Sequence, residues 1–400
     1  MNVALEQRPA AIWARRLLLA AVAVVTFSVA LGQFMLALAC VPLAFWVARA
    51  RPALPPLLIP ALLFLAIAWL TLAFNTAKPD FSRMTKLLWF VALPAAAWLL
   101  RDERSVRHLL WAFALGCSAL AARTLVMVPV GAWKLLHSPN PETVVYAQNF
   151  PHALTLQGSM PDGQMLMLGL VATLGLLLIQ RAARQPMGLV TTLFLLQIAG
   201  FILNLKRGSW IVAILLLVIF VLTKLTWKHT LLIALVIAGA LCLPPVRARL
   251  TTLERDFNPD VGGRATMWLR VAPALIKAHL WGIGYRQLTN EKMRAVAPNV
   301  EADRDHLHNN ALTVLVETGW VGLAAYVFWM GWALVDAVRR LWRAREESEA
   351  AAIAALVLLL MFVGLLLNGV VEYNFGTSRL MIAAGVIMGS GLLWRAEKAV

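Results

Sequence analysis

The chain has few charged residues and few cysteines, and each shortage excludes a class of protein. Asp, Glu, Lys and Arg make up only 14% of its 400 residues, against about a quarter in an ordinary soluble protein. Such a composition excludes a disordered chain, and three cysteines are too few for a disulfide scaffold. The apolar residues form long uninterrupted runs and lack the alternation of a membrane barrel. The sequence therefore predicts an all-α, polytopic membrane protein, because helices satisfy the backbone in lipid.

Basic residues outnumber acidic ones by 36 to 20, which gives a formal net charge of +16. In a soluble domain this excess would indicate nucleic-acid binding. Here the positive charges gather at the ends of apolar runs, and no basic stripe is interleaved with exposed aromatic residues. We therefore predict the lipid bilayer as a partner and no nucleic acid.

About twelve apolar runs have lengths near the roughly 17 to 25 residues that cross a membrane. They cover residues 17–32, 34–49, 57–74, 86–100, 109–130, 164–179, 187–205, 210–223, 230–243, 311–335, 350–371 and 380–394. Lys and Arg are concentrated in alternate short loops, which predicts that both termini are cytoplasmic. A second apolar run follows the first almost at once, so the first is expected to be an uncleaved span and not a signal peptide.

This pattern divides the chain into three parts. Residues 1–243 are expected to hold the first nine transmembrane helices, and residues 311–400 the last three. Residues 244–310 are expected to lie between them as a loop on the outer side, too long to be a turn. A second outer segment, residues 131–163, is rich in Pro, Asn and Gln, as is typical of a mobile loop.

Within the long loop, residues 264–281 have the spacing of an amphipathic helix. The residues expected on its apolar face are Trp268, Val271, Leu275 and Ala278. Because Arg270 and Lys277 lie together on another face, we predict an interfacial helix on the membrane surface, bent at Pro273.

Lys206 and Arg207 lie between two apolar runs on the outer side. Charges so close to lipid are costly and usually face a cavity or a partner. Because a helix is expected to begin here, its N-terminal N–H groups and dipole would add positive potential, which favours a phosphate site. The alternative is an ordinary pair of snorkelling side chains at a helix end.

Gly262, Gly263 and Arg264 form a second candidate. Paired glycines let the backbone approach a ligand closely, and a guanidinium can bind two phosphate oxygens at once. A Gly-Gly turn beside a solvated arginine is also common, so the pattern alone is weak.

A third candidate is the segment 303–310, which leads directly into an apolar run. His308 beside Asn309 is suited to proton transfer, because histidine titrates near neutral pH. Asp303, Asp305 and the two histidines of this segment could also form a divalent-metal cluster. The more common interpretation of such residues in an outer loop is simple solvation.

Three further ionisable residues, Arg123, Glu317 and Glu372, lie within or at the end of apolar runs. Such groups are functional candidates by default. The alternative is structural pairing, in which Glu317 or Glu372 neutralises an arginine, and the sequence leaves the choice of arginine open.

The three blocks, in this order and spacing, resemble the O-antigen ligase family over roughly residues 190–325. The residues that carry the resemblance are Lys206, Arg207 and Gly208; Gly263, Arg264 and Trp268 with Gly282, Ile283 and Gly284; and His308, Asn309 and Leu312 with Glu317, Gly319, Gly322 and Leu323. The resemblance implies a glycosyltransferase of the bacterial inner membrane whose active site faces the periplasm. Its donor would be a glycan on undecaprenyl diphosphate and its acceptor lipid A-core, with no metal and no other cofactor.

The same resemblance implies roles for individual residues. It makes His308 the catalytic histidine and assigns Arg207 and Arg264 to the donor diphosphate. The neighbouring residues expected to bind substrate are Lys206, Gly263, Asn309 and Glu317. The family also includes O-antigen polymerases and protein O-oligosaccharyltransferases that use the same donor, and a lipid-linked glycan transporter is a more remote alternative.

Overall fold

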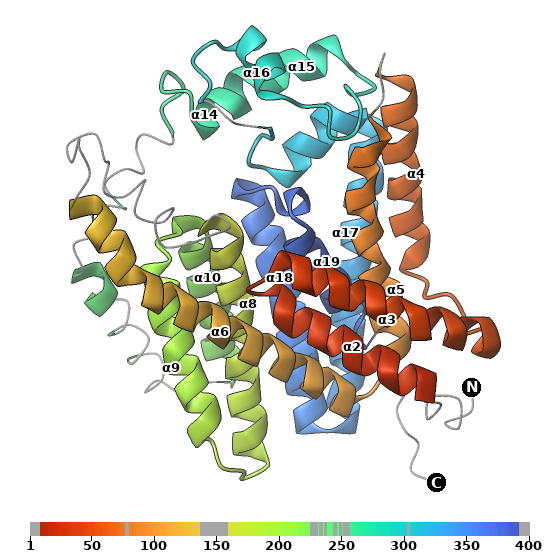
Figure 1. Ribbon diagram of the computed structural model, residues 1–400, viewed down its shortest axis with the longest axis vertical. Coiled ribbons are helices and arrows are strands. Elements are labelled where there is room, and N and C mark those ends of the chain that lie inside the picture. The colour runs from red at the N-terminus through yellow and green to blue at the C-terminus, as the bar shows by residue number, and fades with distance from the viewer. Residues whose placement is uncertain are drawn as a thin grey trace.

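The structure is a computed structural model that describes residues 9–76, 80–136, 159–224, 257–301 and 305–391, together with residues 231, 235, 238–242, 246–247 and 250. Throughout these ranges the regular elements are helices and no strand occurs, which confirms the predicted all-α class (Figure 1).

The helices overlap the predicted apolar runs closely. In the first half of the chain they are α2 (Pro9–Val25), α3 (Val29–Ala50), α4 (Leu58–Phe74), the 3₁₀ helix η1 (Phe81–Val91), α5 (Ala92–Leu99) and α6 (Glu103–Leu136). They continue as α8 (Ser159–Ala182), α9 (Gly188–Leu203), α10 (Arg207–Lys224), α17 (Asn310–Glu347), α18 (Glu349–Val371), the short η3 (Asn374–Gly376) and α19 (Ser378–Gly389). Half of the predicted run 230–243 lies outside the described residues, and its described positions are helical.

Five of these helices, α3, α6, α8, α17 and α18, are long and apolar enough to cross a membrane, and α4, α9, α10 and α19 are shorter apolar helices. The architecture is thus that of a multi-pass membrane protein, while the number twelve stays a prediction. The outer segment 131–163 is shorter than predicted, because α6 continues to Leu136 and α8 already begins at Ser159. Residues 137–158 lie outside the described part of the chain.

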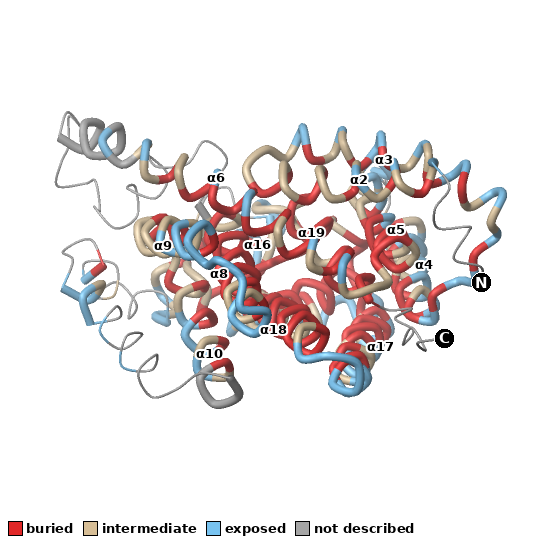
Figure 2. The backbone as a smooth tube through the Cα atoms, turned by 90° about the horizontal axis from the view of Figure 1, so that it is seen from below, coloured by how far each residue is buried: buried red, intermediate tan, exposed pale blue. Residues whose placement is uncertain are grey.

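Burial separates the inner helices from those that face lipid. The helix α18 is apolar on all sides and packs against α17, α8, α10 and α19, so most of it is buried (Figure 2). The helix α3 instead exposes a stripe made of Leu31, Phe34, Leu38, Val41 and Phe45. In water such a stripe would be unfavourable, whereas hydrocarbon solvates it.

Four short helical elements form a cap over one end of the bundle (Figure 1). They are α14 (Arg264–Thr266), the π-helical η2 (Met267–Val271), α15 (Ala272–Ala278) and α16 (Asn290–Val296). The π-helical turn lies just before Pro273, the residue at which the sequence predicts a bend, and it places this proline in the first turn of α15. A proline is tolerated there because first-turn N–H groups have no partner within the helix.

The predicted apolar face of the cap helix is largely covered by protein. Val271 and Leu275 are buried in a cluster with residues of the cap and of α17, Trp268 is half-buried against it, and Ala278 is exposed. The large exposed apolar side chains of this segment are Leu269, Leu280 and Trp281. A position on the membrane surface stays a prediction, and these three residues are the ones that would contact lipid.

The cap is joined to α17 by two backbone hydrogen bonds and by the close approach of Gly319 to the cap backbone. The amides of Ile283 and Gly284 donate to the carbonyls of Val316 (3.0 Å) and Glu317 (2.9 Å). Gly319 interrupts α17 with φ 67°, and a Cβ atom there would lie 2.6 Å from the carbonyl oxygen of Leu280. Only glycine suits this position, because other residues rarely adopt positive φ and none fits the space.

We expect Gly319→Ala to destabilise the protein by at least about 1–3 kcal/mol, the usual cost of a strained backbone position. Gly331→Ala, in the same helix, is the matched control. A Cβ atom at Gly331 meets nothing within 4 Å, so alanine there should be neutral or slightly stabilising. Thermal unfolding of the detergent-purified proteins measures both effects, and equal melting temperatures for the two variants would contradict the close approach.

Candidate functional site

Lys206 and Arg207 lie where the sequence predicts, at the start of α10. Leu205 has a left-handed conformation with φ 57°, which turns the chain from the end of α9 into α10. The side chain of Arg207 is buried. A Cβ atom on Gly208 would lie 3.2 Å from Cγ2 of Val371, so the start of α10 packs beside the end of α18. The positive end of the α10 dipole thus lies close to Glu372, the residue that follows α18.

Arg264 holds the end of α18 from the side of the cap. Its Nη2 lies 2.5 Å from Oε1 of Glu372, and its Nε donates to the carbonyl oxygen of Val371 at 3.1 Å. Glu372 is buried. The guanidinium therefore neutralises a buried carboxylate and also caps a carbonyl group at a helix C-terminus.

His308 contacts the other oxygen of the same carboxylate. Its Nδ1 lies 3.0 Å from Oε2 of Glu372, and the side chain is only 3% exposed. The indole N–H of Trp268 donates to the carbonyl oxygen of Leu307 at 2.6 Å, which fixes the residue before the histidine. His308 itself has φ 50°, a strained conformation that is typical of functional positions.

Glu372 thus joins two of the three predicted groups, Arg264 and His308, which lie 108 and 64 residues before it in the sequence. The charge of Lys206 is also close enough to lower the pKa of Glu372. The sequence singled out Glu372 as a partner for an arginine but did not connect it with His308. The one available signal was an acidic residue at the end of an apolar run.

The charges at this site favour a neutral histidine beside an ionised carboxylate. Burial lowers the pKa of His308 to about 4, although the hydrogen bond with Glu372 acts in the opposite direction. Burial alone would raise the pKa of Glu372, but the hydrogen bond from His308 and the charges of Arg264 and Lys206 lower it overall. The neutral imidazole therefore donates Nδ1–H to the carboxylate, and Nε2 carries the lone pair.

If His308 acts as a base, this pKa sets the pH dependence of the reaction. Protonation of Nε2 removes the lone pair, so we expect the rate to fall as the pH decreases through about 4. An ordinary histidine would give the same fall near pH 6.5. The measurement is kcat/KM for transfer by the purified protein between pH 3.5 and 8. An acid limb centred above pH 6 would contradict the buried environment.

Residues 192–327 match the family model described as O-Antigen ligase. The chain carries an O-antigen ligase domain. This match agrees with the resemblance, and the matched segment is similar to glycosyltransferases of the O-antigen ligase and polymerase type. No curated protein matches the chain. The ligase domain includes Lys206, Arg207, Arg264 and His308, whereas Glu372 lies beyond its end.

Two other predicted residues of the ligase domain, Asn309 and Gly263, have different surroundings. Asn309 caps α17 by accepting a hydrogen bond from the amide of Leu312 at 2.9 Å, and it donates to the carbonyl oxygen of Val370 at 2.8 Å. It thereby joins the start of α17 to the end of α18. Gly263 precedes α14, and a Cβ atom there would meet nothing within 4 Å, so open space lies beside Arg264.

The structure decides which acidic residue pairs with which arginine. Glu372 pairs with Arg264, as described above. Arg123 pairs with Asp162 at 3.0 Å, and the same buried carboxylate also binds Arg379. The sequence analysis did not single out Asp162, which lies in the first turn of α8 inside a segment predicted to be a loop. Glu317 contacts none of these arginines and lines a separate cavity.

Asp305 and His306 contact each other, with Oδ1 and Nδ1 2.6 Å apart. This hydrogen bond lowers the pKa of Asp305 to about 2. Asp303 lies outside the described residues. Among the residues that are described, no three His, Cys, Asp or Glu side chains lie close enough together to hold a metal ion. The metal-free assignment of the ligase domain stays a prediction.

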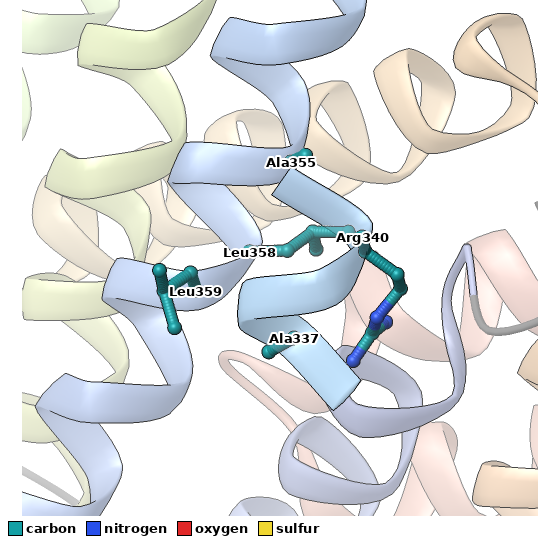
Figure 3. A pocket seen from close by; sticks show the side chains of 5 residues that line it. All are labelled: Ala337, Arg340, Ala355, Leu358 and Leu359. Carbon is teal, nitrogen blue, oxygen red and sulfur yellow. The ribbon is translucent and has the colours of Figure 1, made fainter. Parts of the chain in front are cut away.

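A buried arginine toward the other end of α17 has a structural role. Figure 3 shows Arg340 among Ala337, Ala355, Leu358 and Leu359. It pairs with Asp336 at 3.1 Å and donates to the carbonyl oxygen of Ser390. Its contacts join α17 to the end of α19, and its apolar surroundings offer nothing that would recognise a glycan.

Proposed function

We propose that the protein is an inverting glycosyltransferase that moves O-antigen glycan from undecaprenyl diphosphate to lipid A-core. The observation that carries the proposal is the buried Glu372 carboxylate, which binds His308 through one oxygen and Arg264 through the other. A base and a phosphate-binding cation are thus held at fixed positions beside Lys206 and the start of α10. The ligase family match supports the donor and acceptor classes.

In the proposed reaction, Nε2 of His308 removes the proton from an acceptor hydroxyl group. The hydroxyl oxygen attacks the anomeric carbon of the donor from the face opposite the diphosphate, and the bond from this carbon to the phosphate oxygen breaks. The configuration at the carbon is inverted. The proton stays on His308, where the Glu372 carboxylate stabilises the resulting imidazolium.

Preorganised positive charge would stabilise the departing diphosphate. Arg207 and Lys206 lie at the N-terminus of α10, and Arg264 lies beside open space at Gly263. Because these groups are already in place, they stabilise the charge that develops on the leaving group without reorganising during the reaction. In this proposal the positive charge of the site comes from the chain itself.

The direction of α17 supports a periplasmic site. This helix starts at Asn310, next to His308, and ends at Glu347 at the end of the bundle opposite the cap (Figure 1). Its last turns contain Arg339, Arg340, Arg343 and Arg345. Because such clusters mark the cytoplasmic side, we propose that the cap faces the periplasm of an inner-membrane protein with both termini in the cytoplasm.

Arg264→Lys tests the geometry of the cation. Lysine keeps the charge but cannot donate to Val371 and Glu372 together while facing the donor, so we expect kcat/KM to fall by about tenfold or more. The matched control is Arg270→Lys on the same cap helix, where the arginine forms an exposed ion pair with Asp260. The assay is transfer by purified protein reconstituted with a lipid-diphosphate glycan and lipid A-core. Equal kcat/KM for the two variants would show that Arg264 does not bind the donor.

The same assay separates the alternatives within the family. A polymerase would elongate the lipid-linked glycan and ignore lipid A-core, and an oligosaccharyltransferase would modify a protein hydroxyl group. A transporter would bind its substrate near the bilayer midplane, whereas Arg264, His308 and Glu372 lie at one end of the bundle. Transfer of the whole glycan to lipid A-core, with inversion, is the result expected here.

A further inference from the structure

A polar cavity lies next to the candidate site, with a volume of about 570 Å³. The 3₁₀ helix η1 contributes Arg83 and Lys86, and the loop between α15 and α16 contributes Arg286. Among the described residues that line it, only Leu288 has an aliphatic side chain. The walls therefore suit a charged or hydroxylated ligand and not a prenyl chain.

The basic side chains of this cavity are held in place by backbone carbonyl groups. Arg83 donates to the carbonyl oxygen of Arg286, Arg286 donates to that of Phe375 at 3.2 Å, and Lys86 donates to that of Gly376 at 3.4 Å. These carbonyl groups position the cations without removing their charge, and Arg83 also forms an exposed ion pair with Asp80 at 3.2 Å. The carboxylates on the wall are Asp305, which is already hydrogen-bonded to His306, and Glu317.

Glu317 supplies an independent indication that a ligand binds here. Its side chain is 2% exposed, and it lines the cavity. One of its oxygens, Oε2, has no hydrogen-bond partner among the residues that the structure describes. Buried polar atoms are nearly always hydrogen-bonded, so a ligand hydroxyl group is a suitable donor to this oxygen.

The cavity adjoins His308 but is separate from the cations proposed to bind the donor. The rings of His306 and His308 lie 4.3 Å apart, and His306 is bound to Asp305 on the cavity wall. Tyr373, also on the wall, directly follows Glu372 in the sequence. None of Lys206, Arg207 and Arg264 lines the cavity. The site therefore has a second group of basic residues, on the cavity wall, that is distinct from the first.

We propose that this cavity binds the acceptor saccharide through an anionic substituent, a phosphate or a carboxylate, with Arg83, Lys86 and Arg286 as its ligands. The proposal rests on the proposed function. Inversion requires the attacking hydroxyl group and the leaving diphosphate to lie on opposite faces of the anomeric carbon, so two anionic substrates need separate basic sites. Glu317 accepts a hydrogen bond from a sugar hydroxyl group in the same cavity.

The test uses the full-length protein in nanodiscs and lipid A-core in three forms: untreated, with its phosphates removed, and with its carboxylates reduced. Acceptor binding is measured without donor, so no transfer occurs. For wild type we expect removal of the recognised substituent to weaken binding about tenfold or more, as for other hydrogen bonds to charged groups, and the form that loses affinity identifies the substituent. Arg83→Gln and Lys86→Gln should bind the untreated acceptor as weakly as wild type binds the treated form. Treatment of the acceptor should then change the affinity of these variants little.

Steady-state kinetics separates acceptor from donor. We expect Arg83→Gln and Lys86→Gln to raise the acceptor KM with little change in donor KM, while Arg270→Gln, on the exposed side of the cap, behaves as wild type. A raised donor KM with unchanged acceptor KM would overturn the proposal and assign the cavity to the donor. Unchanged acceptor affinity in two folded variants would also overturn it. Absence of transfer by wild type itself would instead refute the proposed function.

Discussion

His308→Ala is expected to lower kcat for glycan transfer by about 10² to 10⁴-fold, the usual contribution of a general base. The acceptor hydroxyl group is a poor nucleophile until its proton is removed. His308 is the one histidine that contacts Glu372 among the described residues, and its buried environment keeps it neutral at physiological pH. The affinity for the lipid-diphosphate donor should change little, because the basic residues remain.

The matched control is His279→Ala. His279 is an exposed histidine at the end of α15 in the same cap, so its loss should leave kcat unchanged. Reconstituted transfer with saturating donor and acceptor measures both variants. A product rate for His308→Ala close to that of wild type would eliminate this histidine as the base, and an equal loss in both variants would indicate damage to the cap.

Glu372→Gln is expected to have the second-largest effect, with kcat reduced by at least about 10²-fold and by up to about 10⁴-fold. The upper figure is the loss seen when the carboxylate of a serine-protease triad is neutralised. The carboxylate holds Nδ1 of His308 and stabilises the imidazolium that forms when the proton is taken up. The amide would also remove the negative charge of Glu372 beside Arg264 and weaken the contact that holds its guanidinium.

The pH profile distinguishes this positioning role from simple damage to the fold. Glu372 raises the pKa of His308 against the effect of burial, so in Glu372→Gln the acid limb should move to lower pH. Glu372→Asp keeps the charge on a shorter side chain and should recover part of the lost rate. An unchanged acid limb with wild-type kcat would show that His308 does not depend on this carboxylate.

Some features of this protein follow from local sequence alone. The length of the apolar runs predicts helices of the right type and position, because helix formation in lipid depends on neighbours within a few turns. The positions of Arg207 at a helix start and of His308 just before a helix follow from the ends of these runs. The ligase motifs were also visible, because their residues lie close together within each block.

Other features depended on tertiary packing. The sequence gives no sign that Glu372 binds both Arg264 and His308, because these contacts span 108 and 64 residues and form only where the cap meets the end of α18. The pairing of Arg123 with Asp162 arises in the same way, between α6 and α8. The cavity at Arg83, Arg286 and Glu317 also joins distant segments. Periodicity and composition report on neighbours along the chain, whereas a buried charge selects its partner only after the helices have packed.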